Sequence, residues 1–279
     1  MRYSTLLAFV ATAITSLYLA SCVGCDTTRD HGIPVDPNQT YDSARLSFMV
    51  DSVPFDMILV KGGTFIMGND SDRNNKPCQV TLSSYYIGEA EVTRQLWFAV
   101  MGHEEGQPAD SLDPQLPIDC VSWDRAMDFI EKLNEITGRK FHLPTEAQWQ
   151  FASQGGCQSK GYRYSGSDNA DEVAWFSYNN EHELHPVKTK RANELGIYDM
   201  TGNVAEWCYD RAGARPEGPL KDPMGAAKSK DGYNDPRVIR GGELYSIDDT
   251  LPPVNVFKEE HNSQWTYSRG IWLGFRLAL

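Results

Sequence analysis

Hydrophobic residues recur at helical spacing between Ser122 and Gly138, in the segment SWDRAMDFIEKLNEITG. Ser122 is a favourable N-cap, because its hydroxyl can accept a hydrogen bond from a backbone N–H of the first turn. Gly138 can end the helix in the left-handed conformation. The pattern predicts an amphipathic helix, and its core-facing side consists of Ala126, Phe129, Ile130, Leu133 and Ile136.

Two shorter helices are predicted from their end signals. Thr93 precedes an apolar run that reaches Met101 and is followed by Gly102, so it can cap a short helix. In LPTEAQWQFASQGG, Thr145 and Gln148 have the spacing of a capping box. This second helix is expected to end at Gly155.

Strand patterns dominate the rest of the first half of the chain. Two apolar runs flank Lys61, Gly62 and Gly63 in MILVKGGTFIMG, residues 57–68, which predicts a β-hairpin. VTLSSYYIGEAEVT, residues 80–93, continues in the same manner, and GIWLGFRLAL, residues 270–279, is the expected closing strand. Between residue 156 and that strand, short aromatic runs alternate with turn residues, so we expect structured loops that carry the function.

The first residues indicate export and lipid attachment. Arg2 precedes an apolar run that ends in LASC at Cys22, which is typical of a lipoprotein signal peptide over residues 1–21 with lipid on the cysteine thiol. The alternative is an ordinary signal peptide with an incidental cysteine. A polar, flexible tether is expected over residues 22–50, with its clearest composition between Val23 and about Ala44, followed by one domain over residues 51–279.

Charge and cysteine content narrow the function further. The net charge of −12 and the pI of about 4.9 argue against nucleic acid as a partner. The six cysteines match no zinc pattern. An exported chain can form one or two disulfides, which the sequence does not assign, and Cys25 or Cys208 is the expected free thiol.

Several segments, in order, resemble the formylglycine-generating enzyme family, also called sulfatase-modifying factors. They are GGTFIMG (62–68), EVTRQLW (91–97), VSWDRAMDFIEKLNEITGRKFHLPTEAQWQFASQGG (121–156), ELGIYDMTGNVAEWC (194–208), RVIRGG (237–242) and LGFRLAL (273–279). The resemblance runs from about Met57 to the last residue. It implies an α+β fold, the family's variant of the C-type lectin-like fold, rich in irregular loops.

The resemblance also shows what this chain lacks. Active members oxidise a sulfatase cysteine to formylglycine, with oxygen and a copper ion held by two cysteines beyond the Arg-Gly-Gly motif. The matching positions here are Ser246 and Leu251. Monovalent copper requires soft thiolate ligands, so we expect neither copper nor formylglycine-generating activity, and no catalytic residue is assigned.

The same resemblance implies a structural calcium ion in YDMTGNVAEWC. The matching positions are Asp199, Gly202, Val204 and Glu206, through two side chains and two backbone carbonyls. Calcium takes six to eight oxygen ligands, which water can complete. In the alternative interpretation, Asp199 and Glu206 cap backbone donors of an ordinary turn.

Two classes of function follow from these features. The first is a non-catalytic, lipid-anchored binding or assembly protein of the bacterial cell envelope, expected at the outer membrane on its periplasmic or surface face, with a protein, peptide or glycan ligand. The second is an enzyme with altered, non-copper oxidative chemistry. Among the histidines only His182 and His185 are spaced as a pair, and ordinary loop residues explain them better than metal binding. The candidate binding cleft consists of Arg240, Glu243, Tyr245, Asp248, Asp249 and Trp265.

Overall fold

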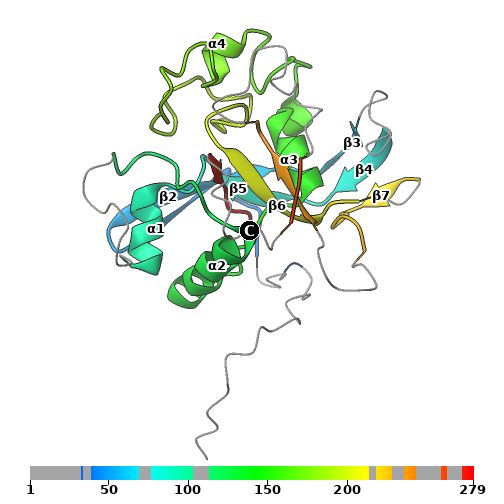
Figure 1. The fold of residues 1–279 in the computed structure, drawn as a ribbon. Helices are drawn as coiled ribbons and strands as arrows, with labels where there is room; N and C mark the ends of the chain where they lie inside the picture. Colours follow the sequence, from blue (N-terminus) through cyan, green and yellow to red (C-terminus); the bar gives the residue numbers. More distant parts are fainter. Residues whose placement is uncertain are drawn as a thin grey trace, which may run out of the picture. The chain divides into compact units, whose positions relative to one another are not determined.

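The computed structural model describes residues 33, 39–68, 77–102, 113–213, 218–227, 236–242, 259–262 and 272–279. The chain divides into two units, Met1–Ile33 and Pro34–Leu279. All helices and strands below belong to the second unit (Figure 1). No helix in the described ranges has the length and apolar character needed to cross a membrane.

The first sheet has the strand order β1-β2-β5. Its members are β1 (Arg45–Val50), β2 (Val53–Val60) and β5 (Tyr85–Gly88), all antiparallel. Asp51 and Ser52 join β1 to β2 with φ values of 43° and 66°, as in the primed turns that match the twist of a hairpin. β1 begins at Arg45, so regular structure starts directly after Ala44, where the tether-like composition ends, and before residue 51, where the domain was expected to begin.

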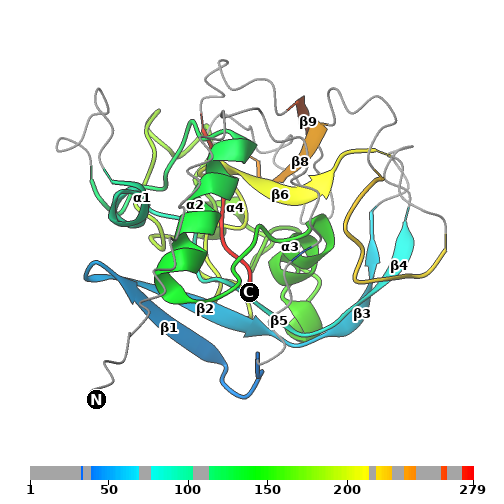
Figure 2. The ribbon, with the colours of Figure 1, turned by 90° about the horizontal axis from the view of Figure 1, so that it is seen from below.

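The predicted hairpin over residues 57–68 is also wrong. β2 and β3 (Gly63–Met67) lie in different sheets, and Figure 2 shows them running apart. A two-residue hairpin turn needs positive φ, which neither Lys61 nor Gly62 has. Gly62 instead allows close packing, since a Cβ there would lie 2.5 Å from the Leu82 carbonyl oxygen. β3 pairs with β4 (Cys78–Leu82), which pairs with β7 (Leu220–Lys221).

The third sheet carries most of the candidate site. Its order is β10-β6-β8-β9, with β6 (Ala205–Arg211), β8 (Pro236–Arg240), β9 (Glu259–Asn262) and β10 (Leu273–Gly274). The expected closing strand is thus short within the described residues. The last residue still reaches the first sheet, where Tyr86 and Leu279 exchange two backbone hydrogen bonds of 2.9 Å.

The three predicted helices are confirmed, together with their caps. α1 (Arg94–Met101) begins after Thr93, α2 (Trp123–Thr137) lies between Ser122 and Gly138, and α3 (Glu146–Ser153) has the complete Thr145/Gln148 capping box. α1 packs against α2, and α3 lies beside β6 and β8 (Figure 1). One part of the helical prediction is wrong: Ile136 is 53% exposed, because the buried side chains of α2 end at Leu133 and the last turn extends past the core.

The segment between α3 and β6 is irregular, as expected. It contains only the 3₁₀ turn η1 (Gly156–Gln158) and the short helix α4 (Ala170–Val173). Aromatic rings hold the helices to the end of the chain: Trp97 stacks on Phe129 with ring centres 5.3 Å apart, and Phe275 meets both rings edge-on. The four cysteines in the described part of the chain, Cys78, Cys120, Cys157 and Cys208, form no disulfide.

Candidate functional site

The described residues include only the start of the expected binding cleft. Arg240 ends β8, and Gly241 and Gly242 follow with φ values of 100° and 75°, which favour glycine. Glu243, Tyr245, Asp248, Asp249 and Trp265 lie outside the described residues, as do Cys22 and the positions of the absent cysteine pair, Ser246 and Leu251.

Arg240 supports this segment from inside the protein. Its side chain is 1% exposed and that of Glu146 is 4% exposed, and Nη2 lies 2.5 Å from Oε1. Gln150, which lies in α3 like Glu146, accepts a second and longer hydrogen bond of 3.4 Å from Arg240 Nη2. The side chain of Arg240, which was expected in the candidate binding cleft, is therefore paired with a buried carboxylate and closed off from solvent.

The turn from Asp199 to Glu206 lies directly against the Arg-Gly-Gly segment. Gly202 donates its N–H to the Gly241 carbonyl at 3.0 Å. Asp199, Gly202 and Asn203 all have φ between 56° and 78°, so the turn is tightly coiled and leads into β6. A Cβ on Gly202 would lie 2.2 Å from the Trp175 carbonyl oxygen, so glycine is required there on steric grounds as well.

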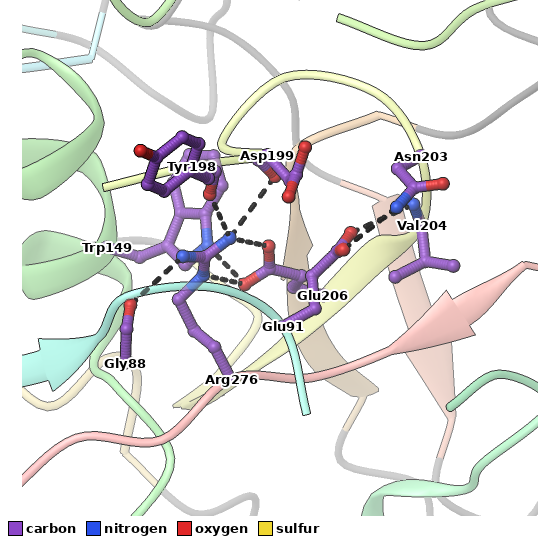
Figure 3. Close-up of polar contacts among 9 residues, drawn as sticks. All are labelled: Gly88, Glu91, Trp149, Tyr198, Asp199, Asn203, Val204, Glu206 and Arg276. Carbon is purple, nitrogen blue, oxygen red and sulfur yellow. Dashed lines mark hydrogen bonds and ion pairs between the residues drawn. The ribbon is translucent and has the colours of Figure 1, made fainter. Parts of the chain in front are cut away.

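Arg276 occupies the centre of the site and is fully buried (Figure 3). Its Nε and Nη2 atoms each donate to one carboxylate oxygen of Glu206, at 2.6 Å in both cases. The same guanidinium donates to the backbone carbonyls of Gly88, Tyr198 and Asp199 at 3.1 to 3.2 Å. Burial opposes the charged form, but the charge and hydrogen bonds of Glu206 outweigh it and raise the pKa of Arg276. The arginine therefore joins β5, the turn, β6 and the C-terminal segment.

A second carboxylate, Glu91, lies on the other side of the turn. It accepts hydrogen bonds from the Asn203 side chain at 2.9 Å and from the Val204 backbone N–H at 3.2 Å (Figure 3). Burial raises the pKa of Glu91 well above its usual value, and the charges of Asp199 and Glu206 raise it further. Glu91 therefore binds the turn through both of its carboxyl oxygens.

Asp199 completes a group of three buried carboxyl groups. Its Oδ2 atom accepts the Lys188 backbone N–H at 2.7 Å. Burial raises the pKa of Asp199 to about 6, although the Lys188 N–H and the charge of Arg276 act in the opposite direction. Of these three carboxyl groups, Glu206 contacts the guanidinium directly, whereas Glu91 and Asp199 act on it through their charges, which raise the pKa of Arg276.

The geometry of Glu206 tests the expected calcium site. Oε2 accepts from both Arg276 and Trp149, the latter at 2.8 Å, and Oε1 accepts from Arg276. Three of the roughly four lone pairs of the carboxylate are therefore taken by N–H donors. The described ranges contain no group of three or more His, Cys, Asp or Glu side chains placed to hold a metal ion. The Glu206 carboxylate therefore has little capacity left, in this conformation, to serve as one of the oxygen ligands that calcium requires.

The two histidines that were spaced as a pair have structural contacts. His185 stacks on Trp175 with ring centres 3.6 Å apart, and its Nε2 atom lies 2.9 Å from the Asn180 carbonyl oxygen. His182 is bound through its backbone N–H to the Asn180 side chain at 2.8 Å. These contacts favour the loop interpretation of the pair.

Sequence reasoning missed three members of the site: Glu91, Trp149 and Arg276. One signal was available, because Arg276 is a lone charge in the apolar run LGFRLAL, and a buried charge requires a partner. Glu91 and Trp149 carried no such signal. Their positions depend on contacts between segments far apart in the chain.

Comparison with known proteins agrees with these features. The family described as "Sulfatase-modifying factor enzyme 1-like domain" matches residues 49–279. A protein of Paenibacillus barcinonensis named "Chaperone protein LppX" is 33% identical over 211 residues, which cover 57% of this chain and 72% of that protein. The formylglycine-generating enzyme of Streptomyces coelicolor is 30% identical over 202 residues, which cover 65% of this chain and 60% of the enzyme.

The solved structure of Treponema denticola variable protein 1 superimposes with a TM-score of 0.73 and 28% identity, covering 85% of this chain and 99% of that chain. The mixed α+β architecture, with few helices and several sheets, is that of the formylglycine-generating-enzyme variant of the C-type lectin-like fold. The chain therefore belongs to the family with the sulfatase-modifying factor enzyme 1-like domain.

Proposed function

We propose that this chain is a lipid-anchored, non-catalytic binding or assembly protein of the bacterial cell envelope. One observation carries the proposal: the framework beneath the Arg-Gly-Gly segment is complete, yet no cysteine follows Cys208 in the sequence. A domain that has this framework, but no cysteine after the Arg-Gly-Gly segment, is suited to holding a ligand and not to copper-dependent oxidation.

The support for the segment is built from two buried ion pairs. Arg240 binds Glu146 below the start of the segment, and Arg276 binds Glu206 at the neighbouring turn. Such a scaffold holds the Arg-Gly-Gly segment, from which the candidate binding residues follow in the sequence, at a defined position. The acidic and aromatic residues of that loop can contact a protein, peptide or glycan, whereas a serine and a leucine cannot bind monovalent copper.

The relatives are compatible with a role other than oxidation. The relatives include a formylglycine-generating enzyme and also a protein named as a chaperone. The domain therefore does not by itself imply one reaction, because function depends on the residues that a fold carries.

The catalytic part of the proposal is tested with the full chain purified in detergent. It is incubated with a cysteine peptide derived from a sulfatase, copper and oxygen, and the peptide is analysed by mass spectrometry, with the S. coelicolor enzyme as positive control. We expect no formylglycine above the no-protein control. Formylglycine formation, or oxygen uptake by a chain that retains iron or copper, would instead support the enzyme with altered chemistry.

The membrane part is tested by substitution of the proposed lipidation site. Cys22→Ala should release the chain from the membrane fraction, because acyl chains and not the folded domain make the attachment. Cys25→Ala, three residues later, is the matched control and should stay with the membrane. Unchanged sedimentation of the Cys22 variant would contradict lipid attachment at that residue.

A further inference from the structure

The guanidinium of Arg276 contacts both ends of the turn that runs from Asp199 to Glu206. It binds the Asp199 backbone carbonyl at 3.2 Å and both carboxylate oxygens of Glu206 at 2.6 Å (Figure 3). We propose that Arg276 is the built-in structural cation of this turn and that the domain is stabilised without calcium. The proposal concerns the scaffold and does not depend on the proposed function.

The atoms that Arg276 gathers are those of a hard-cation site. Besides the two oxygens of Glu206 and the Asp199 carbonyl, they include the carbonyls of Tyr198 and Gly88. Calcium binds the same mixture of carboxylate and backbone oxygens. A guanidinium satisfies them through directed N–H donors, and its planar fork matches the bidentate carboxylate.

Arg276 also does what a free ion cannot. Its side chain is attached to the segment after β10, and it ties that segment to β5 through Gly88 and to β6 through Glu206. The cation is therefore supplied by the chain itself and is present whenever the domain is folded. A calcium ion at Glu206 would compete with a guanidinium already bound to both carboxylate oxygens and would be repelled by its charge.

The arrangement predicts an exchange of cations. Without the guanidinium, the buried Glu206 carboxylate would lose its counter-ion, and the carbonyls of Tyr198, Asp199 and Gly88 would lose the donor that they share with it. Buried uncompensated charge is strongly destabilising, and a divalent cation that binds only the folded state would restore stability by mass action. The wild-type chain should not respond to calcium, whereas a variant that lacks the arginine should.

The test compares melting temperatures of the full chain in detergent, with chelator and with millimolar CaCl₂. For wild type we expect no shift, and no calcium in the purified protein by elemental analysis. Arg276→Ala should melt on the order of 10 °C lower, as expected for a broken buried ion pair, and calcium should recover several degrees. Arg240→Ala removes another buried, ion-paired arginine as a matched control, and it should melt lower without responding to calcium.

Arg276→Lys keeps one positive charge and provides a second test if the alanine variant does not fold. It should melt below wild type, because an ammonium cannot reproduce the bidentate fork, and it should remain indifferent to calcium. The proposal is overturned if chelation lowers the melting temperature of wild type, or if wild type contains stoichiometric calcium. It is also overturned if a folded Arg276→Ala variant shows the same indifference to calcium as the Arg240→Ala control.

Discussion

Arg240 and Glu146 form a buried ion pair between the end of β8 and the first turn of α3, with Nη2 2.5 Å from Oε1. The pair fixes β8, which leads into the Arg-Gly-Gly segment, against α3. Because both side chains are almost fully buried, neither can be rehydrated when the other is removed, and the cost of breaking the pair is large.

Glu146→Gln should therefore lower the free energy of unfolding by roughly 3 to 5 kcal/mol, since it leaves the Arg240 charge buried without a counter-ion. Urea denaturation of the full chain measures the change. The control is Glu172→Gln, which breaks the Arg191–Glu172 pair, 53% and 44% exposed, and should cost less than about 1 kcal/mol. Similar losses in the two variants would show that burial does not govern the strength of the Arg240 pair.

Two glycines with similar backbone angles differ in what surrounds them. Gly202 has φ of 78° and the Trp175 carbonyl oxygen 2.2 Å from the position of a Cβ, whereas Gly196 has φ of 82° and nothing within 4 Å. Gly196→Ala should cost only the strain of positive φ, about 1 to 2 kcal/mol. Gly202→Ala should cost at least about 2 kcal/mol more, because backbone must move. Thermal unfolding compares the two, and equal losses would rule out the steric role of Gly202.

His142 should make stability depend on pH. Burial lowers the pKa of this side chain to about 4, and its Nδ1 atom lies 2.8 Å from the Leu143 carbonyl oxygen. Between pH 6.5 and 4 the unfolded chain takes up a proton on this histidine that the folded chain does not. The stability that neutral His142 contributes is therefore complete above pH 6.5 and is lost as the pH falls. At roughly 1.4 kcal/mol per pKa unit, the loss approaches about 3 kcal/mol.

The contribution is measured as the difference between wild type and His142→Gln in the free energy of unfolding from pH 7 to pH 4. A difference is needed because Asp199, whose pKa is raised to about 6, gives the opposite trend as the pH falls through that value. Subtraction leaves the trend of Asp199 out, since both proteins share it. A difference that stays constant across this range would contradict the prediction.

The exposed end of α2 supplies the last prediction. Leu133 is fully buried and Ile136, one turn later, is 53% exposed. Leu133→Ala should cost about 2 to 5 kcal/mol through a lost contact and a cavity, whereas Ile136→Ala should change stability by less than about 0.5 kcal/mol. Denaturant midpoints of the two variants decide this. A large loss of stability in the Ile136 variant would show that Ile136 does belong to the core-facing side of the helix, as its spacing predicted.

The helices were predictable because their signals are local. Thr93, Ser122 and Thr145 accept hydrogen bonds from backbone N–H groups of the turn that each precedes, three residues along the chain, so sequence spacing is enough to find the caps. The error at Ile136 has a related cause. A helical period says which side faces inward, but the length of the core decides where that side stops being buried.

The strands show the opposite case. The runs on either side of Lys61 and Gly62 were recognised as strands, yet their pairing was wrong, because strand partners are chosen by long-range packing and not by the segment between them. Of the site, the turn at 199–206 was visible in the sequence. The burial of Arg240 and Glu91 and the position of Trp149 were not.

The amino-acid order alone therefore established the family, the capped helices, the acidic charge and the absence of thiols after Cys208, because each depends on residue identity at a given spacing. The tertiary structure decided which groups contact the turn from Asp199 to Glu206. Arg276 and Glu206 are 70 residues apart in the chain, and only folding brings a guanidinium to both oxygens of that carboxylate, where a motif match had suggested a metal ion.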